Sequence, residues 1–291
     1  MNGILVVDKP AGPTSADVVR VAKKLWREKT GHLGTLDPFA TGVLPLCIGE
    51  ATKVAQLLAD ADKEYVGVLV LGARTDTGDP TGRVVEQIAV PADIGSRLAT
   101  IPARVGGRRL QTPPMYSAIK RDGIPLYKLA RQGLVVDRPP REVEIEFLEL
   151  EVVGEGMVRF RVRCSKGTYV RVLAEEIAAA LGTVGHLTEL RRLRFGPFRI
   201  EQAVTLDQLK KGEHAPLISI GSALPDLRRF PVPDRLQERV RQGARDLLSG
   251  LPEGTAGERA LLVNRAGEPV AVVEFQDRGW KYLRVLAPAR A

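Results

Sequence analysis

The chain has 291 residues, of which 44% are hydrophobic, and this length predicts two domains with sizeable cores. The net charge of +8 favours a polyanionic partner, with nucleic acid as the first candidate. No apolar stretch approaches the roughly 18 residues of a membrane span, and the apolar run near the N-terminus is too short for a signal peptide. We therefore expect a cytoplasmic protein without membrane attachment.

The sequence contains no recognisable cofactor or metal site. Cys47 and Cys164 lie in the apolar runs LPLCIG and VRCS, so we expect both to be small buried hydrophobic side chains. The three histidines are scattered along the chain, and neither a GxGxxG nor a Walker-type phosphate loop occurs. We therefore expect chemistry that side chains carry out without a metal or a cofactor.

Local patterns in the first 75 residues predict three strands and two helices. Pro10 ends the first strand, and Thr14 or Ser15 provides the N-cap of a helix that ends near Trp26. In chain order, the expected elements are 3–9 (strand), 15–26 (helix), 43–49 (strand), 51–62 (short helix) and 64–73 (a strand buried on both faces).

The second half of the first domain continues with strands and one long helix. The hydrophobic alternation slips by one position within residues 143–152, which indicates a β-bulge. Residues 157–164 alternate cleanly, and residues 168–182 predict a helix that ends at Gly182. Long strands interleaved with a few helices predict an α+β, or mixed α/β, fold in which helices flank a central, mainly antiparallel sheet.

The amino-acid composition of the chain changes near residue 225. The stretch LPDLRRFPVPD is rich in Pro and Arg, as expected for a domain boundary. Three short apolar runs separated by the turns NRAGE and QDRG follow it. We therefore expect a first domain of residues 1–228 and a small β-rich domain of residues 229–291.

The excess positive charge is concentrated in one segment. Residues 101–141 contain nine Lys or Arg and only two acidic residues, which gives +7 of the chain's +8. A basic stretch is usually a solvated face, but this concentration, with tyrosines and a methionine interleaved, favours an RNA-binding insert. The expected phosphate contacts are Lys120, Arg121, Lys128 and Arg131.

Asp37 is the single carboxylate in the apolar, glycine-punctuated stretch GHLGTLDPFATGVLPL, which covers residues 31–46. Pro38 biases the backbone of Asp37 towards an extended conformation, and Gly34 and Gly42 permit a tight bend around it. Such a loop can aim the carboxylate outwards as a nucleophile or a base. From this stretch alone, an Asx turn or a helix cap is the better interpretation.

Arg171 is expected in the first turn of the helix at 168–182, where the helix dipole disfavours a cation by about 0.3–1 kcal/mol. A compensating carboxylate is therefore expected. Glu175 can form an ordinary surface pair, which contributes little. A carboxylate from elsewhere in the fold explains the placement better, and a buried Arg partner would keep the pKa of that carboxyl from rising.

Six stretches together resemble the TruB family, the tRNA pseudouridine-55 synthases, of the bacterial stand-alone type. The catalytic motif of that family is matched by GHLGTLDPFATGVLPLCIGEATK. The others follow in the family's order across about residues 3–210: DKPAGPTS, DKEYVGVLVLGARTDTGDPTG, QTPPMYSAIKRDGIPLYKLARQG, CSKGTYVRVLAEEI and HLTELRRLRFGPF. The last 60 residues resemble the PUA-type RNA-binding domain of the family more loosely.

The resemblance implies isomerisation of uridine 55 in the tRNA T loop, without a cofactor or an obligatory protein partner. It implies that Asp37 is the catalytic aspartate and that Arg171 pairs with it. Tyr65 is implied to pack on the target base and is a candidate base for the late proton abstraction. The implied contacts to the flipped-out nucleotide are Tyr169 and Leu190, which line the uracil pocket, and His32.

Two alternatives share parts of this pattern. The basic segment and the C-terminal domain would also suit a non-catalytic RNA-binding protein, although binding alone needs no paired buried charge. A guide-RNA-dependent synthase of the dyskerin type shares the catalytic motifs. The long segment PMYSAIKRDGIPLYKLARQG favours the stand-alone enzymes, whose insert grips the tRNA T arm directly.

Overall fold

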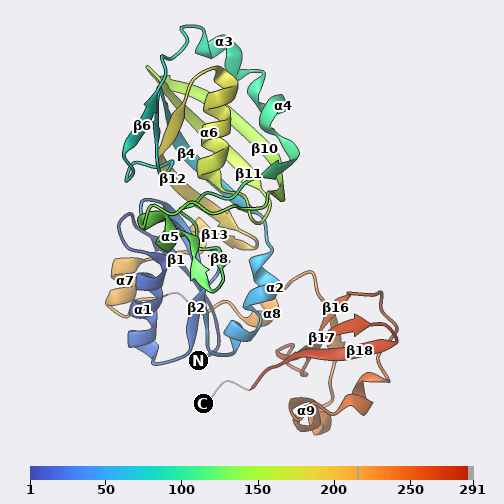
Figure 1. The fold of residues 1–291 in the computed structure, drawn as a ribbon. Coiled ribbons are helices and arrows are strands. Elements are labelled where there is room, and N and C mark those ends of the chain that lie inside the picture. The colour runs from blue at the N-terminus through green and yellow to red at the C-terminus, as the bar shows by residue number, and fades with distance from the viewer. Residues whose placement is uncertain (215, 288–291) are drawn as a thin grey trace.

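The computed structural model describes residues 1–214 and 216–287, and they form a large and a small sheet joined side by side (Figure 1). The large sheet has ten strands. They are β1 (Gly3–Lys9), β2 (Thr30–His32), β3 (Thr41–Ile48), β4 (Lys63–Leu71), β7 (Gly107–Gln111), β10 (Arg141–Gly154), β11 (Met157–Cys164), β12 (Gly185–Phe195), β13 (Phe198–Arg199) and β14 (Val204–Thr205).

The strand order is β14-β1-β3-β12-β4-β11-β10-β7, with β2 paired to β3 and β13 to β12. Within the large sheet, only β1/β14 and β3/β12 pair in parallel, so the expected mixed and mainly antiparallel sheet is confirmed. Strand β4 lies between β12 and β11, and seven of its nine residues are buried. This central place explains why its sequence is apolar on both faces.

Helices flank the large sheet (Figure 1), as the sequence predicts. The longer ones are α1 (Ser15–Trp26) and α6 (Val170–Leu181), and both contribute buried residues to the main hydrophobic core. The shorter ones are η1 (Gly49–Lys53), α2 (Ala55–Ala59), α3 (Ile94–Leu98), α4 (Ile101–Val105), η2 (Ile200–Gln202), α7 (Leu206–Lys210) and α8 (Ile220–Ala223). A small hairpin, β5 (Ala73–Thr75) and β6 (Val84–Gln87), follows β4.

Several local predictions are confirmed at the level of single residues. Thr14 is the N-cap of α1 and forms a capping box with Asp17. The register of β10 against β11 shifts between Ile145 and Phe147, where the slipped alternation predicts a bulge. Helix α6 ends at Gly182, whose φ of 89° is in the left-handed region that glycine tolerates. The segment predicted as one short helix at 51–62 is instead the 3-10 turn η1 followed by α2.

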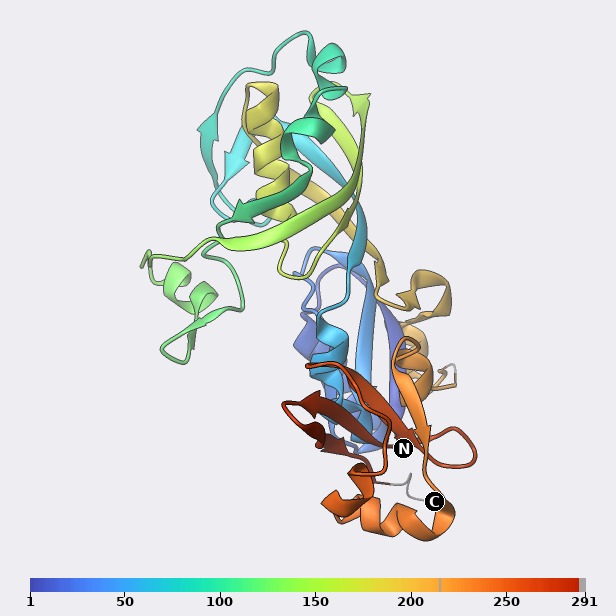
Figure 2. The same ribbon diagram turned by 90° about the vertical axis from the view of Figure 1, so that its right-hand side faces the viewer.

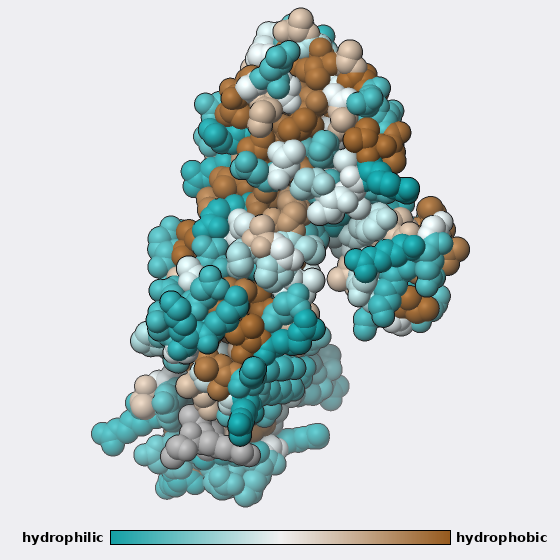
Figure 3. Space-filling model, turned by 90° about the vertical axis from the view of Figure 1, so that its left-hand side faces the viewer, coloured by the Kyte–Doolittle hydropathy of each residue, from teal (hydrophilic) through white to brown (hydrophobic). Residues whose placement is uncertain are grey.

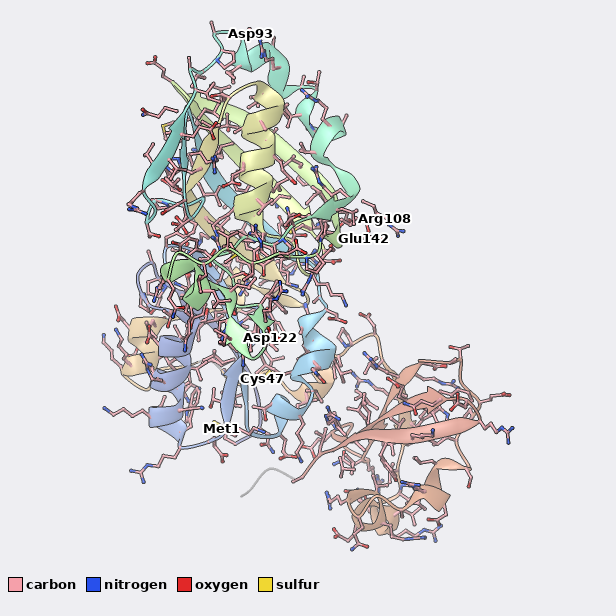
Figure 4. All side chains as sticks on the ribbon, viewed as in Figure 1. Met1, Cys47, Asp93, Arg108, Asp122 and Glu142 are labelled. Carbon is pink, nitrogen blue, oxygen red and sulfur yellow. The ribbon has the colours of Figure 1, made fainter. Side chains whose placement is uncertain are left out.

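The basic segment 101–141 is divided between the body and a protrusion. Residues 101–111 form α4 and the edge strand β7, where Arg108 lies opposite Glu144 of β10 (Figure 4 labels Arg108 and Glu142 at this edge). Residues 112–140, here called the basic module, extend away from the body (Figure 2). The module contains β8 (Lys120–Arg121), β9 (Ile124–Pro125) and α5 (Leu126–Arg131), with Asp122 at its hairpin turn (Figure 4).

This division changes the charge of the protruding part. Of the nine Lys or Arg residues in the segment, four lie in the body and its sheet edge, and the module keeps five against two aspartates. Its excess is therefore +3 rather than +7. Figure 3 shows the module as a lobe with hydrophilic side chains over most of the visible face and small hydrophobic patches between them. The exposed large hydrophobic side chains of the module are Ile124, Leu134 and Val135.

The small sheet has the order β15-β16-β17-β18 and begins at Arg228. Its strands are β15 (Arg228–Pro231), β16 (Arg259–Val263), β17 (Pro269–Gln276) and β18 (Gly279–Val285), and α9 (Asp234–Arg241) and η3 (Arg245–Leu248) pack against it. One hydrophobic cluster contains Val43 and Cys47 of the large sheet together with Leu261 and Val272 of the small one. The two sheets are thus joined by a shared apolar core.

In the described part of the chain, no helix is both long and apolar enough to cross a bilayer.

Candidate active site

The loop that carries Asp37 joins β2 to β3 and is held in place from two sides. Buried Lys9 donates from Nζ to the carbonyls of Pro10 and Pro13 at 2.8 Å and of Pro38 at 3.1 Å. The Ser15 hydroxyl, at the start of α1, both donates to and accepts from the backbone of Leu36. These contacts fix the residues on both sides of Asp37.

The glycines expected to bend this loop do so. Gly34 has φ 58° and Gly42 has φ 101°, which other residues rarely adopt. A Cβ at Gly42 would lie 2.2 Å from the carbonyl oxygen of Arg192, so glycine also permits the close approach of β3 to β12. The local sequence therefore determines the conformation of the loop, but the position of the loop in the fold depends on its contact with β12.

The Asp37 carboxylate forms a two-pronged ion pair with Arg171. Arg171 Nε donates to Asp37 Oδ2 at 2.8 Å, and Nη2 donates to Oδ1 at 3.3 Å. The Arg171 side chain is 5% exposed and that of Asp37 is 34% exposed, so Arg171 is buried while Asp37 is accessible from the cavities that it lines. The carboxylate thus neither caps a helix nor closes an Asx turn, and the carboxylate expected to compensate Arg171 is Asp37 rather than Glu175.

Arg171 also binds two backbone carbonyls from distant loops. Its Nη1 donates to Thr77 O at 2.7 Å, and its Nη2 donates to Tyr116 O at 2.6 Å. Thr77 lies in the hairpin loop between β5 and β6, and Tyr116 lies where the chain enters the basic module. One guanidinium therefore joins α6, the Asp37 loop, this hairpin loop and the base of the module.

Burial raises the pKa of the Asp37 carboxyl above its ordinary value, and the Arg171 guanidinium opposes this rise. The nearby Asp79 carboxylate raises it further. The expectation that the arginine would keep this pKa from rising is therefore wrong, because desolvation outweighs the ion pair. When Asp37 is ionised, the pair holds the carboxylate in a single orientation, since both oxygens accept from one planar group.

Asp79 is a residue that the sequence analysis missed. Its Oδ1 accepts from Thr77 Oγ1 at 2.8 Å, Thr81 N at 2.9 Å and Thr81 Oγ1 at 2.6 Å, so it shapes the loop whose Thr77 carbonyl binds Arg171. The stretch TDTGDPTG predicts turns of this kind. Nothing in it indicates proximity to Asp37, which is 42 positions earlier and on another strand connection.

Two cavities meet at the ion pair. The smaller, of about 300 Å³, is lined by Asp37 and Arg171 together with three residues implied by the resemblance, Tyr65, Tyr169 and Leu190. The larger is a groove of about 830 Å³ between α1, the β5–β6 loop and the basic module. Asp37 and Arg171 line it too, as do two further predicted residues, His32 and Arg131.

The remaining predicted residues do not line either cavity. Lys120 and Arg121 lie on the module hairpin and Lys128 on α5, and all three are exposed. They and Arg131 form no ion pair within the described residues, although Arg121 donates to Asp137 O and Arg131 stacks on Tyr127. These four cations thus remain available to an external anion.

Tyr65 lies on β4 with its side chain almost entirely buried. Burial raises the pKa of its phenol, and the Arg192 guanidinium opposes the rise. The phenol is therefore neutral at neutral pH, so it can accept a proton from a substrate only if its own proton moves to another group. Burial also lowers the pKa of His32, with a further contribution from Arg192.

Two more residues position the site without having been predicted. Gln111, 2% exposed on β7, clamps the backbone of Tyr169, because its Oε1 accepts from Tyr169 N at 2.7 Å and its Nε2 donates to Tyr169 O at 3.3 Å. Arg192, 1% exposed on β12, donates to Val43 O and Gly34 O. Both residues act through tertiary contacts that leave no local sequence signal.

Comparison with known proteins identifies the same family as the motifs. The family model for "TruB family pseudouridylate synthase (N terminal domain)" matches residues 22–170. The model for "tRNA pseudouridylate synthase B C-terminal domain" matches residues 171–216, which end before the small sheet begins.

Curated relatives carry the name "tRNA pseudouridine synthase B". The protein of Geobacter sulfurreducens is 43% identical over 300 residues, which cover 98% of this chain and 99% of the relative. The protein of Psychrobacter cryohalolentis is 48% identical over 216 residues, and this match covers 72% of this chain but only 60% of the relative's length.

Two of the solved structures with a similar fold are more distant in sequence. A chain from an "H/ACA RNP bound to a substrate RNA containing 2′-deoxyuridine" has a TM-score of 0.71 at 26% identity, covering 98% of this chain and 85% of that one. A chain from a "Cbf5-Nop10-Gar1 Complex" has a TM-score of 0.70 at 28% identity, covering 98% and 84%. Because the first family model covers just over half of the chain and the Geobacter relative matches it almost throughout, this chain belongs to the TruB family of pseudouridylate synthases.

Proposed function

We propose that this chain isomerises uridine to pseudouridine at position 55, in the T loop of tRNA, with Asp37 as the reactive carboxylate. The observation that carries the proposal is the Asp37–Arg171 ion pair, which lies where the smaller cavity and the groove meet. The relatives' name, tRNA pseudouridine synthase B, supports tRNA as the substrate.

The reaction fits what these side chains can do. It breaks the N1–C1′ bond of the nucleotide, turns the uracil and joins C5 to C1′, and only the C5 proton is lost. An ionised Asp37 can attack C1′, attack C6 of the ring or remove a sugar proton. Each route needs a desolvated carboxylate with fixed orientation, which the buried guanidinium of Arg171 provides.

The target base must leave its stack to reach Asp37, which costs a few kcal/mol. In the proposed complex the uracil enters the smaller cavity, where Tyr65 offers a stacking surface and Leu190 an apolar wall. The rest of the nucleotide lies in the groove with His32. The cations of the basic module contact phosphates of the T arm, which offsets part of the cost of extruding the base.

The two alternatives predict different behaviour. A non-catalytic RNA-binding protein has no use for a buried ion pair whose aspartate faces a cavity. The solved chains of similar fold, one of them from an H/ACA RNP, are 26–28% identical to this chain, against 43–48% for the relatives named tRNA pseudouridine synthase B, so the comparisons favour the tRNA enzyme over the guide-RNA-dependent alternative. We therefore propose a stand-alone enzyme.

The test uses the purified chain and an unmodified tRNA transcript, with no guide RNA and no other protein. Pseudouridine is mapped by its stable carbodiimide adduct, and a transcript with cytidine at position 55 is the substrate control. Asp37→Asn should give no product, whereas Asp93→Asn, on the exposed α3 turn far from the cavities, should behave as wild type. Product at another uridine would refute the proposed position, and no product would refute the proposed activity.

A further inference from the structure

Lys63 is a buried lysine in the smaller cavity that the mechanism above does not use. It begins β4 two positions before Tyr65, so both side chains point to the same face of the strand. Lys63 is 8% exposed and lines the cavity together with Asp37 and Tyr65. Its Nζ donates to Ala59 O at 3.3 Å and lies 4.7 Å from the ring centre of Phe195.

The other cations of this cavity have strong partners. Arg171 binds Asp37, and Lys166 pairs with Asp60 at 2.8 Å near the surface. Arg192 donates to two backbone carbonyls at 2.7 and 2.8 Å. Lys63, in contrast, has no carboxylate within ion-pair distance in the described part of the chain, and one long hydrogen bond occupies one of its three donors.

The surroundings of Lys63 leave its charge poorly compensated. Burial, and to a lesser extent the Arg192 cation of β12, lower the pKa of Lys63 to about 8. The opposing groups are Cys164 of β11, and Asp62 and Asp60, which precede β4. A buried ammonium with two free donors is therefore ready to bind an acceptor that enters the cavity.

We propose that Lys63 Nζ donates a hydrogen bond to a carbonyl oxygen of the bound uracil, O2 or O4, and stabilises the negative charge that develops when the N1–C1′ bond breaks. This inference rests on the proposed function. The electron pair of the broken bond stays on the ring and spreads over N1, O2 and O4, while the proton stays on Lys63. After the ring has turned, C5 attacks C1′ with this electron pair. The C5 proton then leaves to a base and N1 takes up a proton from solvent, so atoms and charge balance and Lys63 returns to its starting state.

The competing interpretation is structural. Ala59 is the last residue of α2, so Lys63 compensates the negative end of a helix dipole and rests on the ring of Phe195. A simple loss of activity on substitution does not separate the two roles. The test must therefore change the substrate oxygen as well as the lysine.

The experiment is a cycle of two enzymes and three substrates, measured as single-turnover rates at saturating RNA. Wild type and Lys63→Met are each given a tRNA transcript with uridine, 2-thiouridine or 4-thiouridine at the target position, because sulfur is a weaker acceptor than oxygen. We expect Lys63→Met to slow uridine conversion by about 100-fold, as for the loss of one donor to developing negative charge. At the oxygen that Lys63 contacts, replacing oxygen with sulfur should slow the wild-type reaction markedly. The same replacement should slow Lys63→Met at most a few-fold, because the donor is already missing.

Equal thio effects in wild type and Lys63→Met at both oxygens would overturn the inference, since a lysine that only supports α2 leaves them unchanged. Lys166→Met, which removes a paired cation from the same cavity, is the matched control and should show equal effects. If Lys63→Met does not fold, Lys63→Gln is used in the same cycle. A wild type that makes no pseudouridine refutes the proposed function as well, whereas an active wild type with equal effects refutes only the role of Lys63.

The pH profile gives a second readout. Loss of the Lys63 proton should lower kcat/KM of wild type as the pH rises above about 8, and this limb should be absent in Lys63→Met. Cys164, which faces Lys63, has its pKa raised by burial to about 11 and contributes no limb near pH 8. An identical alkaline limb in both enzymes contradicts the inference.

Discussion

Replacing Arg171 with lysine tests whether the catalytic geometry needs a planar fork or only a positive charge. Arg171 makes four hydrogen bonds, two to Asp37 and one each to Thr77 O and Tyr116 O. A lysine has one nitrogen and can replace only part of this set. Losing the two bonds to carbonyls, at about 1.5–3 kcal/mol each for a charged donor, should lower the free energy of unfolding by about 3–6 kcal/mol.

The rate should fall for a separate reason. Losing one of the two charge-assisted bonds to Asp37 removes about 1.5–3 kcal/mol of the interaction energy that holds the carboxylate in its orientation. If that energy is needed in the transition state, it corresponds to a rate loss of roughly 10- to 100-fold. Single-turnover rates at saturating tRNA measure this directly, and urea unfolding measures the stability.

The matched control is Arg159→Lys on β11, which changes an exposed ion pair with Glu151 of β10. It should alter neither the rate nor the unfolding free energy by more than about 0.5 kcal/mol. Single-turnover rates of Arg171→Lys within threefold of wild type would refute the reasoning. They would show that charge alone holds Asp37 in position.

Three further predictions follow from the same site. Asp37→Asn should abolish product while tRNA binding stays within about tenfold of wild type. Because burial raises the pKa of Asp37, the wild-type rate should begin to fall, as the pH decreases, at a higher pH than for an ordinary aspartate. A rate that is flat down to pH 4 argues against an ionised Asp37. Tyr65→Phe should bind RNA normally but slow product formation sharply if the phenol relays the C5 proton, and full activity would leave Tyr65 only a stacking role. Neutralising the four module cations together should make the slope of log K for tRNA binding against log salt concentration shallower by roughly three units, at about 0.7–0.9 per phosphate contact. Single-turnover rates at saturating RNA should stay within a few-fold of wild type. An unchanged slope would show that the module is a solvated face. These cations are Lys120, Arg121, Lys128 and Arg131.

Local signals in the sequence predict many of the elements because their causes are local. The capping box of Thr14 and Asp17 spans three positions, and the alternation of β11 follows from the two-residue period of a strand. Gly182 ends α6 because a left-handed residue is needed directly after the last turn. Each of these signals lies within a few residues of the structure that it determines.

The ion pair could be anticipated only in part. The unfavourable place of Arg171 in the first turn of α6 indicates that some carboxylate compensates it, and the resemblance to the TruB family supplied Asp37 as the partner. The pKa direction was missed, because it depends on how much water the folded chain removes from Asp37 and on the proximity of Asp79. Neither quantity can be read from sequence spacing.

The sequence by itself therefore determined most of the element types, the family and the bend of the loop that carries the Asp37 carboxylate. Only the tertiary structure decided which groups surround that carboxylate. Arg171 and Asp37 are 134 positions apart and meet because β12 lies between β3 and β4, an order that no local pattern specifies. The same order places Lys63 beside Phe195 and Arg192. Pairing of β7 with β10 places part of the basic segment in the large sheet rather than in the module. Strand order is set by the burial of the whole sheet, so such contacts exist only once the chain has folded.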